Sequence, residues 1–328
     1  MSEQFIWGIE VFLNGLMAGV LYALVALGFV LIYKASGIFN YAQGVMALFA
    51  AMTLVGIMNG QVPFAHLINA IFGTNVHHFG WHVPAFLAIL LTAGVMVGFA
   101  WIVQRFIFRH LVGQEPIILF MATIGLAYFL EGVSDLMWNS EIKKLDVGLP
   151  QGINLAIDDF TYGIFDYGFF IDNLDIVATI IAAILVLALT IFSQYSKQGR
   201  AMRAVADDHQ AALSVGVSLN FVWIMVWSVA GFVALVAGIM WGTKSGVQFS
   251  LSLIALKALP VLMLGGFTSI PGAIVGGLII GVGEKLFEFA IGPMIGGATE
   301  NWFAYVLALI FLVFRPQGLF GEKIIERV

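Results

Sequence analysis

Residues 11–33 read VFLNGLMAGVLYALVALGFVLIY, an apolar run without a charged side chain. A helix needs about 20 apolar residues to cross the hydrocarbon core of a bilayer. In that core every backbone N–H and C=O group must be paired within the protein, so such a run forms a helix. We therefore expect residues 11–33 to span a membrane.

The composition of the whole chain agrees with a membrane protein. Of its 328 residues, 61% are hydrophobic and 10% are charged, whereas soluble proteins average about 45–50% and about 25%. The 14 basic residues are scattered and the formal net charge is −5, which argues against a nucleic-acid partner. The chain has no cysteine, which excludes disulfides and Cys-ligated metals, and we expect no metal and no cofactor. We predict an all-α, polytopic membrane helix bundle, with residues 1–328 as a single transmembrane domain.

Eight further segments are expected at the membrane. Five are clear spans: residues 83–104, 115–138, 174–194, 221–241 and 302–314. Residues 43–58 are short for a full span, so we expect a tilted helix or a half-helix there. The run 253–291 is interrupted by Pro260, by Gly265 and Gly266, and by Pro271 and Gly272. These breaks divide it into segments near residues 254–264 and 271–291, which makes nine segments in all.

The lysines and arginines predict the orientation, because short cytoplasmic loops carry an excess of them. If the N-terminus lies outside, three basic residues between the spans are external: Lys143, Lys144 and Lys244. The nine internal ones are Lys34, Arg105, Arg109, Lys197, Arg200, Arg203, Arg315, Lys323 and Arg327. The sequence therefore predicts an outer N-terminus and a cytoplasmic C-terminus.

Two longer regions, residues 59–82 and 139–173, fall on the predicted outer side. The first carries His66, His77, His78 and His82 without a nearby acidic ligand, so a solvated loop is favoured over a metal site. The second is rich in acidic residues and is too small for a core of its own. We expect it to form a cap on the outer surface.

Glycines and polar breaks mark the places where the spans depart from simple helices. The pairs Gly15/Gly19, Gly94/Gly98, Gly272/Gly276 and Gly277/Gly281 are small residues at helical spacing, which favours close helix packing over a role in a pathway. Irregular backbone at membrane depth is tolerated only where it is buried or lines a cavity. Residues 37–44 and 265–269 are therefore candidates for a pathway or gate.

Four carboxylates lie in or at the edge of the spans. Glu131 and Asp135 are close to the outer end of their helix and could simply reach water, whereas Glu284 and Glu288 flank Lys285. An ion pair with Lys285 or with a partner subunit is as plausible for them as a contact with cargo. The chain lacks a G-x-x-x-x-G-K-[ST] phosphate-binding loop and the local signatures of a nucleophilic enzyme, so we expect neither a catalytic residue nor ATP hydrolysis by this chain.

The longest predicted cytoplasmic loop, residues 195–220, has an unusual pattern. It contains SKQGRAMRAVADDHQAALSVGVSLN at residues 196–220. An apolar stripe of Ala201, Ala204, Val205, Ala211, Ala212 and Val215 predicts a short amphipathic helix pair at the inner surface. An Ala-rich face poor in Trp and Phe favours docking into another protein over an interfacial helix without a partner.

This loop resembles the coupling loop of branched-chain amino-acid ABC permeases. Four other stretches are similar to the same family: residues 13–44 (LNGLMAGVLYALVALGFVLIYKASGIFNYAQG), 115–132 (EPIILFMATIGLAYFLEG), 255–286 (ALKALPVLMLGGFTSIPGAIVGGLIIGVGEKL) and 314–328 (FRPQGLFGEKIIERV). Together they cover most of the chain outside the two outer regions. Val45 stands where the family usually carries Glu.

The resemblance implies an inverted-repeat importer permease in the cell inner membrane. Its partners would be a second permease subunit, generally a different homologue, two cytoplasmic ATPases and an external binding protein. The ATPase-coupling residues would be Gly199, Arg200, Arg203, Ala204, Asp207, Asp208 and Gly216. The translocation pathway would include Asn40, Tyr41, Gln43, Gly44, Gly265, Gly266 and Ser269.

The cargo and two other functional classes stay open. A branched-chain or other hydrophobic amino acid is the leading expectation, with urea, short amides and other carboxylates as alternatives within the same family. An ion-coupled secondary transporter that uses Glu131 and Asp135 is a second class. A membrane-embedded enzyme is a third, for which the chain offers no catalytic constellation.

Overall fold

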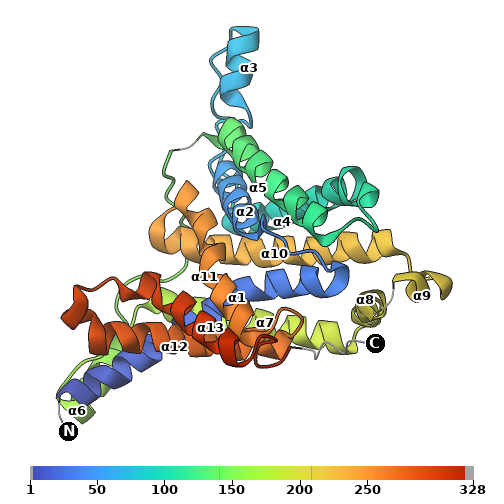
Figure 1. Cartoon of the computed structure of the whole chain (residues 1–328). Coiled ribbons are helices and arrows are strands. Elements are labelled where there is room, and N and C mark those ends of the chain that lie inside the picture. Colours follow the sequence, from blue (N-terminus) through green and yellow to red (C-terminus); the bar gives the residue numbers. More distant parts are fainter. Residues whose placement is uncertain (1–2, 140, 208, 322–328) are drawn as a thin grey trace, which may run out of the picture. The chain divides into compact units, whose positions relative to one another are not determined.

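The computed structural model describes residues 3–139, 141–207 and 209–321. Within them the regular structure is helical, with isolated β-bridges and no strand (Figure 1). Five helices are long and apolar enough to cross a membrane, or six if the bent pair formed by residues 249–265 and 270–295 is one span. The prediction of an all-α polytopic membrane protein is confirmed.

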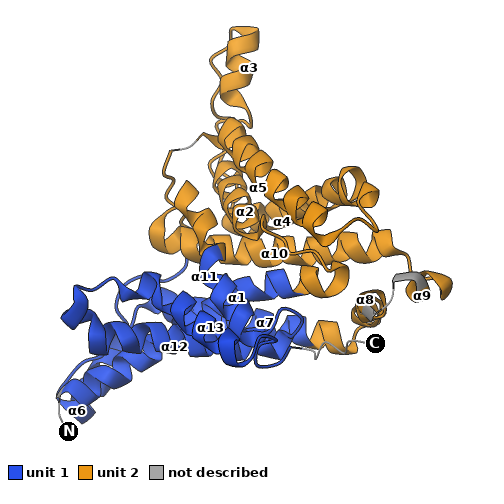
Figure 2. Ribbon diagram, in the orientation of Figure 1, with its two compact units in different colours: residues 1–30, 149–190, 256–328 blue, residues 31–148, 191–255 orange. Residues whose placement is uncertain are grey.

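The chain folds into two compact units, which Figure 2 distinguishes by colour. Unit 1 comprises residues 1–30, 149–190 and 256–328, and unit 2 comprises residues 31–148 and 191–255. Each unit is therefore built from segments that are far apart in the sequence. The prediction of a single transmembrane domain for residues 1–328 stays a prediction.

Unit 2 is centred on two buried helices, α2 (Gln43–Met58) and α10 (Leu219–Ser245). They pack closely because Gly238 of α10 lies against the backbone of Ala47. Gly231, also on α10, contacts Met96 of α4. The other elements of the unit are α3 (Ala65–Phe72), α4 (Ala85–Phe106), η1 (Phe108–His110), α5 (Pro116–Trp138), α8 (Lys197–Asp207), α9 (His209–Ser214) and η2 (Phe249–Leu253).

The direction of each helix in unit 2 follows from contacts at its ends. The last turn of α2 meets the end of α5, where Gly56 lies against the Trp138 ring. The segment after α5 pairs with the segment after α10, since Lys143 and Val247 exchange backbone hydrogen bonds of 3.0 and 2.8 Å. Helices α2, α5 and α10 therefore point their C-terminal ends to one side. At the opposite side, Gln104 near the end of α4 hydrogen-bonds Asn220 at the start of α10, so α4 runs the other way, as the predicted alternation requires.

Unit 1 is built around α1 (Glu3–Ser36) and α12 (Ile270–Ile295). Its other elements are α6 (Leu155–Phe165), α7 (Asn173–Tyr195), α11 (Ile254–Gly265), η3 (Thr299–Asn301) and α13 (Phe303–Phe314). The last residues of α1 and α7 and the first two of α11 belong to unit 2. Helix α13 packs on α12 through stacked rings of Phe287 and Phe303, whose centroids are 4.4 Å apart.

Some of the predicted glycine pairs lie in close helix contacts and others do not. Gly15 and Gly19 of α1 lie against Gly281 and Gly277 of α12, and an added Cβ at Gly19 would stand 2.6 Å from the Gly277 carbonyl oxygen. These pairs bring the two backbones together as expected. In contrast, Gly94 and Gly98 of α4 have no described atom near the position of a Cβ. Their predicted packing role is not realised within the described chain.

Within unit 1, residues 149–173 of the predicted outer region contain α6 and fold back onto the start of α1. Phe169 and Ile171 form a small buried cluster with Ile6. The Glu10 carboxylate of α1 accepts hydrogen bonds from the Tyr167 hydroxyl at 3.1 Å and from the Phe170 backbone at 3.2 Å. The region therefore has no independent core and is stabilised by α1.

Candidate functional site

Residues 37–42 form the irregular segment between α1 and α2. Gly37 has a positive φ of 69°, which lets the chain leave α1 without the cost that a side chain would add. The Asn40 side chain accepts from the Ala42 backbone N–H and donates to the Gln43 side chain, both at 3.1 Å. Gln43 in turn donates to the Ala230 carbonyl of α10 at 3.2 Å. Asn40 and Gln43 are almost fully buried. The Asn40 amide pairs with the irregular backbone, and the Gln43 amide connects it to α10 inside unit 2.

This irregular segment lies beside the interior of α5 and not beside its end. The Thr123 hydroxyl of α5 accepts from the Tyr41 backbone N–H and donates to the Phe39 carbonyl, each at 3.1 Å. Thr123 stands about two turns inside α5, so α2 begins two turns deeper than its neighbour. Helix α2 is thus a shortened helix preceded by irregular backbone, which was one of the two forms expected for residues 43–58.

The prediction that the first break lines a pathway is not decided by these contacts. Asn40, Gln43 and Gly44 are buried, whereas the Tyr41 side chain is exposed. Gly44 is needed for packing, because an added Cβ would lie 2.0 Å from the Ser252 carbonyl oxygen.

The second break separates α11 from α12, and the chain bends by 114° between residues 249–265 and residues 270–295. Gly265 packs against the backbone of Gly272, and Gly266 has a φ of 101°. The Ser269 hydroxyl accepts from the Gly272 backbone N–H at 3.0 Å and so caps α12. These residues make a close turn, and their place on a pathway stays a prediction.

The C-terminal segment closes this turn. Leu319 and Phe320 donate their backbone N–H groups to the Leu264 and Gly265 carbonyls at 2.8 and 3.2 Å. These carbonyls end α11 and would otherwise lack a partner. The segment at residues 319–320 is thus paired with the α11–α12 break, a contact that the separate sequence motifs did not predict.

Helices α8 and α9 follow α7, where the sequence predicted a helix pair. The Arg203 guanidinium donates to the Ser193 carbonyl and, at 3.1 Å, to the Gln194 carbonyl. Arg200 donates to the Tyr195 carbonyl at 3.3 Å. Both arginines therefore bind the unpaired carbonyls at the C-terminal end of α7, where a positive charge is favourable.

Gly199 lets α8 approach the end of α7. An added Cβ would lie 2.3 Å from the Ser193 carbonyl oxygen, and the Gly199 N–H donates to the Ser196 hydroxyl at 2.8 Å.

The predicted apolar stripe of α8 and α9 is only partly buried. Val205 and Ala212 are buried, whereas Val215 is 77% exposed. Ala204 is half-buried, and Gly216 ends the pair with a φ of 86°. Of the predicted residues, Asp208 lies outside the described residues, and the Asp207 side chain is not described.

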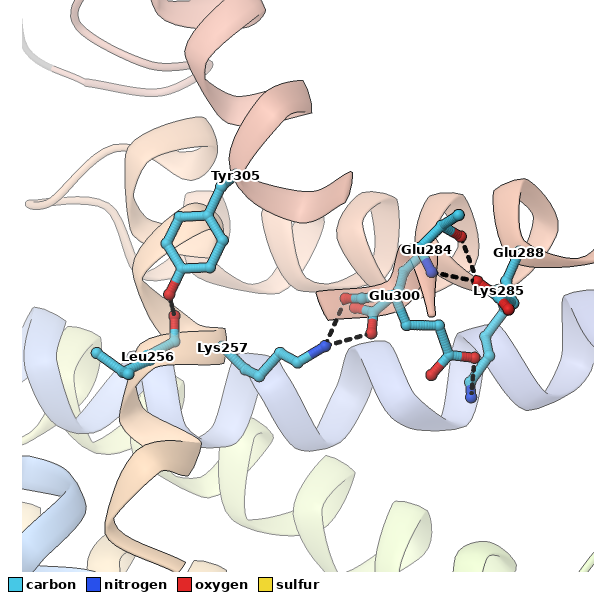
Figure 3. A network of polar contacts seen from close by, with 8 residues as sticks. Leu256, Lys257, Glu284, Lys285, Glu288, Glu300 and Tyr305 are labelled. Carbon is cyan, nitrogen blue, oxygen red and sulfur yellow. Dashed lines mark hydrogen bonds and ion pairs between the residues drawn. The ribbon is translucent and has the colours of Figure 1, made fainter. Parts of the chain in front are cut away.

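A network of charged side chains joins α11, α12 and η3 in unit 1 (Figure 3). Lys257 of α11 forms an ion pair of 2.5 Å with Glu284 of α12 and donates to the Glu300 carbonyl at 2.6 Å. Lys285 pairs with the Glu300 carboxylate at 2.8 Å. Glu284 is 1% exposed, so Lys257 compensates a buried charge.

The predicted carboxylates have different surroundings. Glu284 pairs with Lys257 of α11 and not with its sequence neighbour Lys285, which was one of the predicted partners. Glu288 accepts from the backbone N–H groups of Thr299 and Ala298 at 2.6 and 3.1 Å and from the Thr299 hydroxyl. Glu131 is half-buried and Asp135 exposed near the end of α5, and the expectation that they reach water stays a prediction.

The sequence profile of the permease component of branched-chain amino acid transport systems matches residues 11–315. The chain belongs to this family. It is accordingly a multi-pass membrane permease subunit of an ABC importer, as expected from the coupling loop and the glycine-rich breaks.

Curated relatives match over most of their length. The high-affinity branched-chain amino acid transport system permease protein LivH of Escherichia coli is 29% identical, with 100% of both chains covered. BraD of Pseudomonas aeruginosa, named for the same kind of system, is 29% identical over 96% of both chains. A probable LivH of Methanocaldococcus jannaschii is 24% identical over 92% of this chain and 89% of its own. Among solved structures, PsaBC from Streptococcus pneumoniae in complex with Fab has 16% identity and a TM-score of 0.42 over 95% of both chains.

Proposed function

We propose that this permease imports an amino acid with an apolar side chain, and that ATP is hydrolysed by a separate subunit docked on α8 and α9. The observation that carries the proposal is the attachment of α8 to the end of α7 through Arg203 and Arg200. The names of the permease relatives support the amino-acid cargo. Urea and short amides remain the alternative cargo within this proposal.

The attachment gives a route for mechanical coupling. A force on α8 would be passed to α7 by two guanidinium groups and by the tight contact at Gly199. Because α7 is long enough to cross the membrane, its displacement would reach the membrane interior. Arg203 is then a positioning residue, and the exposed Leu213 and Val215 are available to touch the ATPase.

The two breaks are the proposed movable parts of the pathway. Asn40 and Gln43 fix the first one, and Gly265, Gly266 and Ser269 form the second. Exposed Tyr41 would face the cargo, with Gly44 keeping α2 close to the segment that contains Ser252. In this proposal the buried amides preserve the shape of the break while the residues beside them contact solute.

The proposed assembly contains a second homologous permease, two cytoplasmic ATPases and an external binding protein. It lies in the cell inner membrane, with the N-terminus outside and the C-terminus in the cytoplasm. The direction of α2, α4, α5 and α10 in unit 2 supports this alternation.

A reconstitution experiment tests the proposed function. The complete complex is placed in lipid vesicles, with the binding protein on one side and ATP on the side of the ATPase. We expect accumulation of radiolabelled L-leucine that requires ATP and stops in an ATPase-inactive complex. Uptake that continues without the ATPase and collapses with an ion gradient would instead establish the ion-coupled class.

A further inference from the structure

A pocket of about 250 Å³ lies in unit 2 beside the C-terminal ends of α2 and α5. It is smaller than the roughly 300–1,000 Å³ of pockets for drug-sized ligands, so it suits one small solute. Its walls come from the region after α2, the end of α5 and the segment that follows. The lining residues are Gln61, Val62, Ala65, His66, His77, His78, Met137, Trp138, Asn139, Glu141 and Lys143.

Lys143 is held in this pocket by its backbone and its side chain. Its backbone pairs with Val247, and its ammonium donates to the Gln61 side chain at 2.7 Å and to the Trp138 carbonyl. An ammonium has three N–H donors, so one is left for a ligand beyond the two bonds that Lys143 makes with described residues. Burial lowers the pKa of Lys143, and the negative charge of Glu141 opposes part of this effect. A bound anion would compensate the desolvated charge.

Glu141 supplies the opposite charge to the same pocket. Both Glu141 and Lys143 line it, whereas Ile142 between them is 70% exposed and is not part of the wall. Among the described residues no ion pair joins Glu141 to Lys143. The pocket therefore presents an anion and a cation that are not paired directly with each other.

The remaining wall has an apolar part. Val62, Ala65, Met137 and Trp138 line the pocket beside the two charges. Trp138 is fixed, because it is almost fully buried and its indole N–H donates to the Thr53 hydroxyl at 3.2 Å. An apolar side chain of a ligand would lose water against this wall, while charged ends would meet Lys143 and Glu141.

We propose that this pocket binds a zwitterionic α-amino acid with an apolar side chain, with its carboxylate at Lys143 and its ammonium at Glu141. A simple carboxylate would satisfy Lys143 but would leave Glu141 without a partner, so the zwitterion fits the charge arrangement better. The pocket would be an outer site that holds the solute after its release from the binding protein. The choice of ligand rests on the proposed function.

Binding of radiolabelled L-leucine tests the proposal. The assembled complex in lipid nanodiscs, without binding protein and without ATP, is titrated at pH 7.5. We expect saturable binding that Lys143→Met and Glu141→Gln each weaken about 10- to 100-fold, since each removes one charge-assisted contact. Matched controls are Lys144→Met and Asp159→Asn, which change exposed residues outside the pocket and are expected to leave binding unchanged.

Two leucine analogues identify the role of each charge. Glu141→Gln should weaken displacement by 3-methylbutylamine, which lacks the carboxylate, and should leave displacement by 4-methylpentanoate unchanged. Lys143→Met should do the opposite. Because Lys143→Met also removes bonds to Gln61 and Trp138, Lys143→Arg serves as the charge-preserving variant and should retain binding.

Absence of saturable binding, or binding unchanged in both Lys143→Met and Glu141→Gln, would overturn the proposal. ATP-driven uptake by the same preparation separates this failure from a failure of the proposed function. Normal uptake without pocket binding refutes only the pocket. Pocket binding without ATP-driven uptake supports the pocket and contradicts the import function.

Discussion

Four glycines set how closely α1 and α12 approach in unit 1. Gly15 and Gly19 face Gly281 and Gly277, with backbone atoms at distances that leave no room for a Cβ. In lipid, helices gain little from the hydrophobic effect, so close backbone packing is a main source of their association. The contact therefore stabilises unit 1 directly.

Gly277→Ala is expected to destabilise the protein by about 1–3 kcal/mol, because the new methyl group would stand 2.6 Å from the Gly19 carbonyl oxygen. The matched control is Gly98→Ala on α4, where no described atom lies near the added Cβ. Thermal unfolding in detergent measures both. Equal shifts in the two variants would contradict the packing role.

The buried charge of Glu284 depends on Lys257. Lys257→Met is expected to cost about 3–5 kcal/mol, because it leaves a carboxylate that is 1% exposed without its cation. Lys285→Met provides the control, since it breaks the Lys285–Glu300 pair, whose side chains are 33% and 34% exposed, and should cost about 0–1 kcal/mol. Thermal unfolding of the two variants should therefore differ clearly, and similar melting temperatures would refute the proposed dependence.

For single residues, the sequence predicted which side chains have an unusual role, but it predicted less well which residues they contact. The spacing of Gly15 and Gly19 indicated close packing, and α1 shows it, but the same spacing at Gly94 and Gly98 has no such contact. Glu284 was recognised as unusual, yet its partner Lys257 is on another helix. The spacing of residues along one helix does not indicate which residue of another helix lies opposite.

Among the helices, the proposed coupling depends on the attachment of α8 to α7. Arg203→Glu is expected to abolish most ATP-driven uptake while ATP hydrolysis continues, because a carboxylate would repel the Ser193 and Gln194 carbonyls. Ala204→Trp should have the same effect, because the indole ring is much larger than the methyl group at this half-buried position of α8. The measurement is the ratio of solute transported to ATP hydrolysed.

The control for this prediction is Lys197→Glu, which reverses an exposed charge at the start of α8. It should keep the wild-type ratio of transport to hydrolysis. Arg203→Lys should be intermediate, since it keeps the charge but loses the planar group that reaches two carbonyls. Wild-type ratios in both Arg203→Glu and Ala204→Trp would rule out the coupling role.

The long apolar helices and the helix pair α8 and α9 agree with the predictions, whereas the short helices α3 and α6 were not predicted. The limits of α2 agree with the predicted segment at residues 43–58, because its hydrophobic run ends at polar residues on both sides. Helices α3 and α6 lie in regions that were expected to be a solvated loop and a cap. Their sequences lack a long apolar run, and α6 is stabilised by contacts with α1 that are distant in sequence.

At the scale of the whole molecule, the distribution of charge predicts the orientation. The absence of native cysteine allows a direct test with single cysteines and a membrane-impermeant maleimide. Lys144→Cys should be labelled from the outer side of intact cells, and Lys197→Cys only after the membrane is opened. Both side chains are exposed in the structure of this chain, and the labelling is done in cells without the ATPase, which would otherwise cover α8. The reverse pattern would contradict an outer N-terminus.

The membrane class and the helical content could be predicted from the sequence, because composition and apolar length are properties of the chain alone. The family could be predicted only because five stretches of the chain resemble known permeases. The candidate site could be predicted only as a set of segments. The paired carbonyls of Leu264 and Gly265, the helix-capping role of Arg203 and the pocket at Lys143 all depend on contacts between distant segments.

We propose that this chain transports solute only when a separate ATPase drives it. The most direct measurement is uptake of radiolabelled L-leucine into vesicles that contain the full complex, compared with vesicles that contain this chain alone. We expect ATP-dependent accumulation in the first and none in the second. Accumulation by the chain alone, driven by a proton or sodium gradient, would contradict it.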